Sequence, residues 1–228
     1  MTKLKGILLT EGMHGMISQV EGLAKALDIN YSHHTVETKG FWKVIPPKFT
    51  PISDSVFKKI ECEDVDLIIS CGRKSIIPSL FLKKNSKKKV FNIHIQNPKI
   101  KLDNFDLVVV PEHDNLDGHN VLKTKGAIHY LTSEEIEKDK EYLFSISSKL
   151  RDKNIISLII GGPTQYYDYS DRNIQEVFSK VNYLVKENNL SLVVIPSMRT
   201  PKGTIEHAKI YFGNDYLVLD GVDKKAYL

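Results

Sequence analysis

The chain has 228 residues, of which 41% are hydrophobic, and its 32 Lys and Arg exceed its 28 Asp and Glu by only four. This length and composition suit one large folded domain or two small ones and argue against intrinsic disorder. A formal net charge of +4 is too small to indicate a nucleic-acid-binding protein. Short lysine runs at 83–84 and 87–89 are compatible with a phosphorylated ligand or a peripheral membrane contact.

The cysteines and the amino terminus bear on the cell compartment. Cys62 and Cys71 lie nine positions apart with no CxxC or Cys/His ligand spacing, so we expect reduced thiols. No apolar stretch approaches the roughly 20 residues that a membrane span needs. The start of the chain, MTKLKGILLTEGMHG, passes into a glycine loop before any signal-peptide cleavage pattern. We therefore expect a soluble, cytoplasmic protein with no metal site and no resident cofactor.

The first half of the chain alternates apolar strands with helices. Its predicted elements are a strand at 5–10, a glycine turn at 11–15, a helix at 17–27, the strand VDLIIS, a helix at about 75–84 and the strands KVFNIHI and FDLVVV. The stretch at 33–51 is aromatic and proline-bearing, which predicts an irregular excursion. Strands that are continuous apolar runs, separated by helices, favour a parallel sheet buried on both faces.

The second half repeats this alternation. A polar helix at 133–152 predicts a linker between an N-terminal Rossmann-like domain at 1–132 and a C-terminal one at 153–228. The predicted elements after it are IISLII, the loop GGPTQYYDYS, a helix at 171–188 with Asp168, Ser170 or Asp171 as N-cap, LSLVVIPS, a helix at 203–212 and YLVLD. Three strands and two helices are few for a doubly wound domain, so we expect the second domain to be truncated.

Polar clusters follow three of the apolar strands directly. Charged and glycine-rich residues at the carboxyl ends of buried parallel strands are where an open α/β sheet binds its ligand. The candidate residues are those of CGR, PEHD and GGPT, namely Gly72, Arg73, Glu112, His113, Asp114, Gly161, Gly162, Pro163 and Thr164. A further strand-end loop contributes Ser197, Arg199 and Thr200, and its arginine could pair with a phosphate or a carboxylate.

The first glycine loop joins a strand to a helix amino terminus, which favours an anion. Gly12 and Gly15 are three positions apart, so the GxGxxG dinucleotide motif is not met. A tight turn and an anion site are equally good explanations of this loop. Thr164, in the second glycine loop, could likewise donate to a phosphate or cap its own turn.

Two histidines are candidate general bases. His113 stands between two carboxylates in PEHD, and His14 lies in the first glycine loop. Glu112 and Asp114 have an equally good structural role, because they could hold the backbone amides of the following turn. A metal is the weakest interpretation of this cluster, since no HExxH or similar pair supplies further ligands. GxSxG is absent and neither cysteine sits in a nucleophile motif, so nucleophilic hydrolysis is not expected.

Several segments together resemble a known family. They are EGMHGMISQVEGLAKAL, VDLIISCGRKSIIPSL, IQNPK, PEHD followed by GxNV and T-x-GA-x-H, LIIGGPTQYYDYS and SMRTP. The chain is identified by them as a member of the elongated-mitochondria (mitochondrial fission) protein family over nearly its whole length. The resemblance implies a fold similar to the two-Rossmann-domain glycosyltransferases of the B type, with the acceptor on the first domain and the nucleotide-sugar donor on the second.

Two hypotheses for the function follow from the residues and the resemblance. In the first, the protein binds a nucleotide-sugar or another phosphorylated ligand between its halves and transfers a glycosyl group. Arg73 and Arg199 would balance phosphate charge, and His14 or His113 would deprotonate the acceptor hydroxyl. In the second, the protein is a non-catalytic adaptor that recruits a partner to a membrane surface through the aromatic loop around Trp42.

Overall fold

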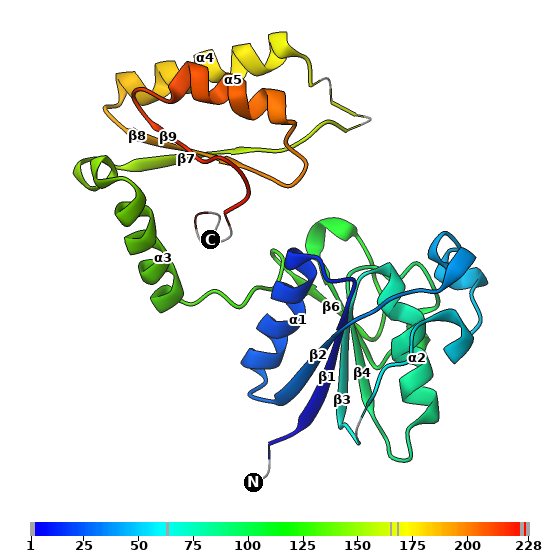
Figure 1. The fold of residues 1–228 in the computed structure, drawn as a ribbon. Coiled ribbons are helices and arrows are strands. Elements are labelled where there is room, and N and C mark those ends of the chain that lie inside the picture. The colour runs from blue at the N-terminus through cyan, green and yellow to red at the C-terminus, as the bar shows by residue number, and fades with distance from the viewer. Residues whose placement is uncertain (1–2, 63, 165, 168, 224–225, 227–228) are drawn as a thin grey trace. The chain divides into compact units, whose positions relative to one another are not determined.

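The computed structural model describes residues 3–62, 64–164, 166–167, 169–223 and 226. The chain forms two compact units, residues 1–130 and residues 131–228, each built around its own parallel sheet (Figure 1). Asp168, one of the expected N-caps, lies outside the described residues. The α/β class with two parallel sheets, predicted from the apolar strands, is confirmed.

The first unit is a six-stranded parallel sheet with helices on both faces. Its strands and α-helices are β1 (Lys5–Thr10), α1 (His14–Ala26), β2 (Asn30–Thr35), β3 (Leu67–Cys71), α2 (Ile76–Asn85), β4 (Phe91–Ile95), β5 (Leu107–Pro111) and β6 (Val121–Thr124). Short 3-10 helices occupy Gly40–Lys43, Pro47–Phe49, Asp54–Val56, Arg73–Ser75, Leu102–Asn104 and Glu112–Asp114. The strand order is β2-β1-β3-β4-β5-β6, so the direction of winding changes between β1 and β3.

The two faces of this sheet carry separate hydrophobic cores. Val20 and Ala24 of α1 pack on Leu8 and Ile69 on one face. On the other face, α2 contributes its buried apolar residues to a core that also holds Val108. Strand residues therefore alternate between two apolar layers, which is why β1, β3 and β5 are continuous apolar runs in the sequence.

Three details of the first unit differ from the sequence prediction. Residues 33–35, expected in an irregular stretch, form the end of β2. This edge strand is mostly exposed and polar, NYSHHT, so it lacks the apolar run that reveals a buried strand. The first helix begins at His14 rather than at residue 17, so Gly15 lies inside its first turn. The short edge strand β6 was not predicted either.

The second unit is a three-stranded parallel sheet in the order β7-β8-β9. Its elements are α3 (Ser133–Ile146), a 3-10 helix (Ser148–Asp152), β7 (Ile155–Ile160), α4 (Asp171–Glu187), β8 (Ser191–Pro196), α5 (Lys202–Phe212) and β9 (Leu217–Val218). Phe178 of α4 and Phe212 of α5 are fully buried on one face of the sheet. Leu143, Phe144 and Leu150 cover part of the opposite face.

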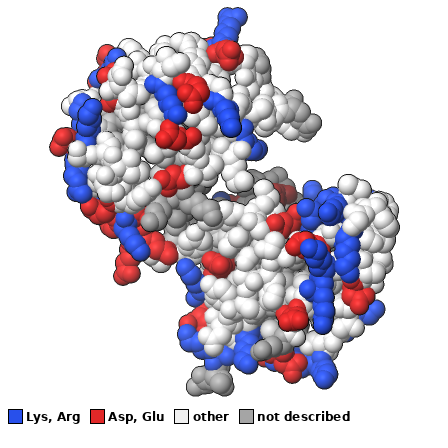
Figure 2. All heavy atoms as spheres, viewed as in Figure 1, with Lys and Arg blue, Asp and Glu red and all other residues white. Residues whose placement is uncertain are grey.

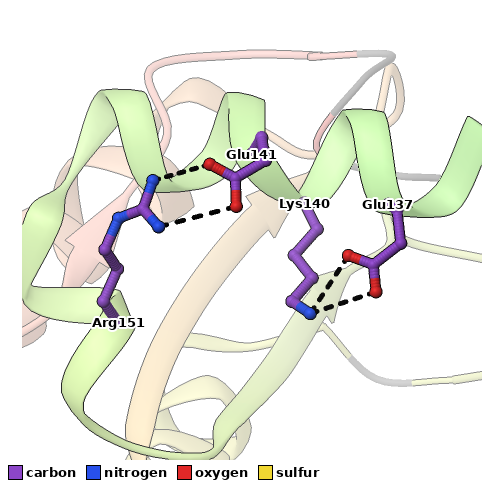
Figure 3. A network of polar contacts seen from close by, with 4 residues as sticks. All are labelled: Glu137, Lys140, Glu141 and Arg151. Atoms are coloured by element: carbon purple, nitrogen blue, oxygen red, sulfur yellow. Dashed lines mark hydrogen bonds and ion pairs between the residues drawn. The ribbon is translucent and has the colours of Figure 1, made fainter.

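Helix α3 has a well-defined start and a polar outer side. Thr132 and Glu135 form a reciprocal capping box at its amino terminus. Figure 3 shows Arg151, from the 3-10 helix that follows, reaching the Glu141 carboxylate with an Nη2 to Oε2 distance of 2.6 Å. Lys140 pairs with the Glu137 carboxylate, one turn earlier in the same helix (Figure 3). The Arg151–Glu141 contact links α3 to the chain that leads into β7, whereas the Lys140 contact lies within the helix.

Candidate functional site

In the first unit, the loops that follow β1 and β3 lie where the winding direction of the sheet changes. Because the winding changes between β1 and β3, the loops after these strands lead to helices on opposite faces of the sheet. Open α/β sheets bind ligands at the carboxyl ends of such neighbouring strands. The register pairs Leu9 with Ser70, so Glu11 and Gly72 come opposite one another two residues further on. The CGR cluster is therefore brought next to the first glycine loop.

An ion pair joins these two loops. Glu11 Oε1 accepts a hydrogen bond from the Lys74 backbone amide at 3.0 Å, and its Oε2 lies 3.1 Å from Lys74 Nζ. The Glu11 side chain is only 15% exposed, so this carboxylate needs a cationic partner. Neither residue was predicted for the site from the sequence.

Two glycines at these strand ends adopt backbone angles that other residues avoid. Gly12 has φ of +82° and Gly72 has φ of +94°. A Cβ on Gly72 would lie 2.7 Å from Met16 Sδ and 3.0 Å from Glu11 Oε1. Glycine is thus required at position 72 both by its conformation and by the close approach of α1.

The amino terminus of α1 has no capping side chain from Met13, and no acidic residue stands in its first turn. Thr10 Oγ1 accepts from the Gly12 amide at 3.1 Å and lies 2.9 Å from His33 Nε2. Burial lowers the pKa of His33, which favours the neutral imidazole. An anion site at this helix start, one of the two explanations of the loop, stays a prediction.

His14 is the first residue of α1. Its Nε2 atom is buried and has no hydrogen-bond partner in the described part of the chain. Its ring meets the Tyr130 ring edge to face, with 6.4 Å between centroids. A buried ring nitrogen without a partner is unusual, so this atom is a candidate to contact a ligand.

Arg73 contacts its own unit. Its Nη2 donates to the Lys43 carbonyl oxygen at 2.8 Å, which directs the guanidinium toward the 3-10 helix at Gly40–Lys43. The side chain is exposed, and its role on a phosphate stays a prediction.

A hollow of about 430 Å³ lies at the carboxyl ends of β4 and β5. It is lined mainly by polar side chains, namely Gln19, Gln96, Asn97, Lys99, His113 and Asp114, with Pro111 and Ala127. Gln96, Lys99 and Asn115 all have positive φ, of 88°, 56° and 48°. Such angles are rare outside glycine and tend to occur at functional sites.

The PEHD cluster is a 3-10 helix beside this hollow. His113 Nε2 lies 3.8 Å from Asp114 Oδ1, and the ring is largely exposed. Within the described residues, neither the Glu112 nor the Asp114 carboxylate accepts a hydrogen bond from the following turn. The histidine therefore has one carboxylate neighbour, Asp114, and the expected amide-holding role of the two acids is not seen.

In the second unit, the loops after β7 and β8 touch. A Cβ on Gly162 would lie 2.1 Å from the Arg199 carbonyl oxygen, so only glycine fits. Thr200 is buried, donates to the Ile160 carbonyl oxygen at 2.6 Å and accepts from the Ser197 amide at 2.8 Å. Thr200 thus shapes the β8 loop from inside, which leaves Arg199 on the surface.

The remaining residues of these loops have identifiable contacts. Tyr169 Oη donates to the Gly161 carbonyl oxygen at 2.8 Å. Thr164 Oγ1 accepts from the Tyr166 amide at 3.2 Å, so its hydroxyl caps its own turn, one of the two roles left open by the sequence. Pro163 is exposed, and Tyr166 and Tyr167 are among the most exposed aromatic side chains.

One titratable group near the first site, the Cys71 thiol, is unreactive. Cys71, at the end of β3, is fully buried, and burial together with the Glu11 charge raises the pKa of its thiol to about 12. Cys71 is therefore protonated and is no nucleophile.

In the described part of the chain, no three His, Cys, Asp or Glu side chains gather where they could hold a metal ion. Nor does any helix there combine the length and apolar character needed to cross a bilayer.

Several site residues escaped sequence analysis. Gln96 and Lys99 belong to IQNPK, which follows a strand in the same way as CGR and PEHD do. The strand-end rule applied to β4 would have found them. Gln19 had no such signal, because a helix residue reaches the hollow only through the packing of α1 on the sheet.

A comparison with known protein families identifies the family of this chain. The model of the family described as "Mitochondrial fission ELM1" matches residues 14–228. The chain belongs to this family. One ELM1 relative, Mitochondrial fission protein ELM1 of Arabidopsis thaliana, is 35% identical over 48 residues, which is 21% of this chain and 11% of the plant protein. The chain thus matches about a tenth of that relative's length.

The ELM1-family chain also resembles solved structures. UDP-GlcNAc 2-epimerase from Methanocaldococcus jannaschii matches it with a TM-score of 0.55 and 11% identity, over 98% of this chain and 74% of the epimerase. An identity this low shows only that the two proteins share a fold. The ELM1-family chain therefore has a glycosyltransferase-B-like architecture, as its resemblance implied.

Proposed function

We propose that this ELM1-family protein binds a nucleotide-sugar, with the diphosphate at the carboxyl ends of β7 and β8, and transfers the sugar to an acceptor hydroxyl. The observation that carries the proposal is the exposed Arg199 side chain on a loop whose backbone touches Gly162. In the described residues, its guanidinium has no hydrogen-bond partner. A guanidinium binds phosphate oxygens in pairs. A Cβ on the neighbouring Gly161 would meet no atom within 4 Å, so a diphosphate could approach the backbone there.

The base of the nucleotide has a candidate platform. Tyr166 and Tyr167 stand exposed on the loop that leads away from Gly162. Aromatic side chains stack on nucleobases with little regard to base identity. The epimerase with the same fold is named for UDP-GlcNAc, which makes uridine nucleotides the first to test.

The acceptor would bind in the β4 and β5 hollow of the first unit. Its amide, amine and imidazole groups suit hydroxyl-rich ligands, because each can donate or accept a hydrogen bond. His113 would take the proton of the acceptor hydroxyl, and Asp114 would stabilise the imidazolium that forms. The acceptor oxygen would bond to the anomeric carbon as that carbon's bond to the diphosphate breaks, and the nucleoside diphosphate would leave. His14, with its unpaired Nε2, is the alternative base.

A thermal-shift screen tests the binding step. UDP, GDP, CDP and their common sugar conjugates are added to the wild type, to Arg199→Ala and to Arg151→Ala. A ligand at 100 times its Kd stabilises the native state by about 2.7 kcal/mol. We expect one nucleotide to raise the Tm of the wild type and of Arg151→Ala, whose guanidinium pairs with Glu141 ahead of β7, but not that of Arg199→Ala.

A turnover assay with the stabilising nucleotide-sugar distinguishes nucleotide-sugar binding from glycosyl transfer. His113→Ala should keep the thermal shift and lose turnover, because the histidine contacts the acceptor and not the donor. The absence of any shift, on protein whose far-UV circular dichroism and cooperative melting show both units to be folded, would reject nucleotide binding and favour the adaptor hypothesis.

A further inference from the structure

Residues 39–53, here called the lysine–aromatic loop, form a closed excursion between β2 and β3. Thr38 and Phe57 pair as an antiparallel bridge at its base. The Lys39 amide donates to the Val56 carbonyl oxygen at 2.7 Å, and the Lys58 amide donates to that of Glu37 at 2.8 Å. Val56 and Phe57 are each 2% exposed, so the base of the loop is anchored in the core.

The inner side of the loop is fixed on the first unit. Trp42 packs against the core on the α2 face, and Arg73 holds the Lys43 carbonyl oxygen. Trp42 is therefore only partly exposed, and the contact surface expected around it must be made by its neighbours. Because Trp42 and Arg73 fix the loop backbone on the first unit, its outward side chains have a defined arrangement.

The outer side of the loop is apolar. Phe41 is 65% exposed, Val44 73%, Phe49 66% and Ile52 41%. Single exposed apolar side chains are ordinary on protein surfaces, whereas this one loop exposes four within twelve residues. Phe41 and Trp42 are neighbours in the chain, yet one ring faces out and the other in, with 4.3 Å between their centroids.

The charge of the loop is of one sign. Residues 39–53 contain three lysines, at 39, 43 and 48, and no Asp or Glu. All three lysines are exposed, and Lys48 Nζ lies 4.6 Å from the centre of the Phe49 ring. On the face of the protein that Figure 2 draws, blue and red side chains are largely interspersed. The flanking acids are Glu37, which pairs with Lys58, and Asp54. The loop itself thus carries three positive charges and no negative one, which suits a negatively charged partner.

From this combination we propose that the lysine–aromatic loop docks on the surface of an anionic lipid bilayer. Aromatic and aliphatic side chains insert at the headgroup level, while lysines bind lipid phosphates with their stems along the apolar surface. A protein partner is the weaker alternative, because the apolar side chains stand on an outward loop instead of lining a groove. The proposal rests on this loop alone and is independent of nucleotide binding.

Vesicle sedimentation tests it directly. The full chain is mixed with vesicles of phosphatidylcholine, or of phosphatidylcholine with about 30% phosphatidylglycerol, at low and high salt. We expect binding to the anionic vesicles that weakens at least tenfold in high salt, since exposed charges are screened. No sedimentation with anionic vesicles, or equal sedimentation with both kinds, would overturn the proposal.

Matched variants separate the loop from nonspecific adsorption. Phe41→Ser with Phe49→Ser should lower the partition coefficient at least tenfold, and Lys43→Gln with Lys48→Gln should remove the preference for anionic lipid. Tyr183→Ser with Ile210→Ser alters two exposed side chains of the second unit and should bind as the wild type does. Trp42 fluorescence checks that each loop variant is folded. Wild-type binding by the Phe41 and Phe49 variant would overturn the proposal.

Discussion

The Glu11 carboxylate holds both the backbone amide and the side-chain ammonium of Lys74, and so ties the loop after β1 to the loop after β3. These loops flank the point where the sheet reverses its winding. At the same place, Gly72 lies against both Glu11 and the α1 residue Met16. The ion pair thus links the two strand-end loops of the first unit.

Removing this carboxylate should destabilise the first unit. Glu11→Ala leaves the Lys74 amide and ammonium without their acceptor, at a cost of about 2 kcal/mol, the range for hydrogen bonds to charged groups. Urea unfolding followed by Trp42 fluorescence reports the first unit, because Trp42 is the single tryptophan. Asp117→Ala removes an exposed partner of Lys123 and should leave the midpoint unchanged. Equal midpoints for Glu11→Ala and the wild type would contradict this role.

Position 72 should tolerate only glycine. Gly72→Ala forces a Cβ into a backbone with φ of +94° and against Met16, and we expect a loss of about 2 kcal/mol. Gly126→Ala is the control, because a Cβ there meets no atom within 4 Å. The same fluorescence-detected unfolding measures both. A Gly72→Ala protein as stable as Gly126→Ala would show that the loop relaxes freely.

His94 should make the first unit acid-sensitive. It is buried on β4, stacks on Phe105 and has its Nδ1 2.9 Å from Ser70 Oγ. Burial lowers the pKa of His94 from 6.5 to about 3 in the folded state. Between these values the unfolded chain binds one more proton than the folded one, so stability is full above pH 6.5 and falls as the pH drops toward 3. The expected slope is about 1.4 kcal/mol per pH unit.

Urea unfolding at several pH values, on the wild type and on His94→Gln, measures this slope. The variant should lose the His94 contribution and show a shallower dependence. If the variant does not fold, the imidazole NMR signals of the wild type give the same answer: the His94 ring should not titrate between pH 7 and pH 4. A ring that titrates near its usual pKa would contradict the assignment.

The two cysteines should react very differently. Cys62 is exposed, whereas Cys71 is buried with its thiol pKa raised to about 12. A thiol reagent at neutral pH should label one cysteine per native chain and two in urea, because the thiolate is the reactive form. Cys62→Ser should abolish the native labelling. Rapid labelling of Cys71 in that variant would show that the end of β3 is open to solvent.

Much of this architecture follows from local sequence. Strands such as β1 and β8 are apolar runs bounded by glycine or proline, and the structure has them within a residue or two of the prediction. Strand β2 escaped because an edge strand exposes polar residues and need not be an apolar run. Local patterns thus reveal buried strands and miss exposed ones.

The candidate site was predicted less completely. Gly72 and His113 were found because strand ends are visible in the sequence, and the strand-end rule says where ligands bind. The Glu11 to Lys74 pair was missed, since it depends on the register of β1 on β3, two strands far apart in the chain. For Trp42 and Phe41 the sequence left two possibilities open, packing on their own domain or an exposed contact surface. The structure packs Trp42 against the core and exposes Phe41.

The most direct test of nucleotide-sugar binding is to map where a nucleotide contacts the protein. Backbone amide NMR signals are recorded while UDP is added to about 1 mM, where a ligand with a Kd of this order occupies half of the sites. The proposal predicts shifts concentrated at Gly161, Gly162 and Ser197–Thr200, and their loss in Arg199→Ala. Signals that stay fixed with UDP and the other nucleoside diphosphates, or that move only away from these loops, would contradict it.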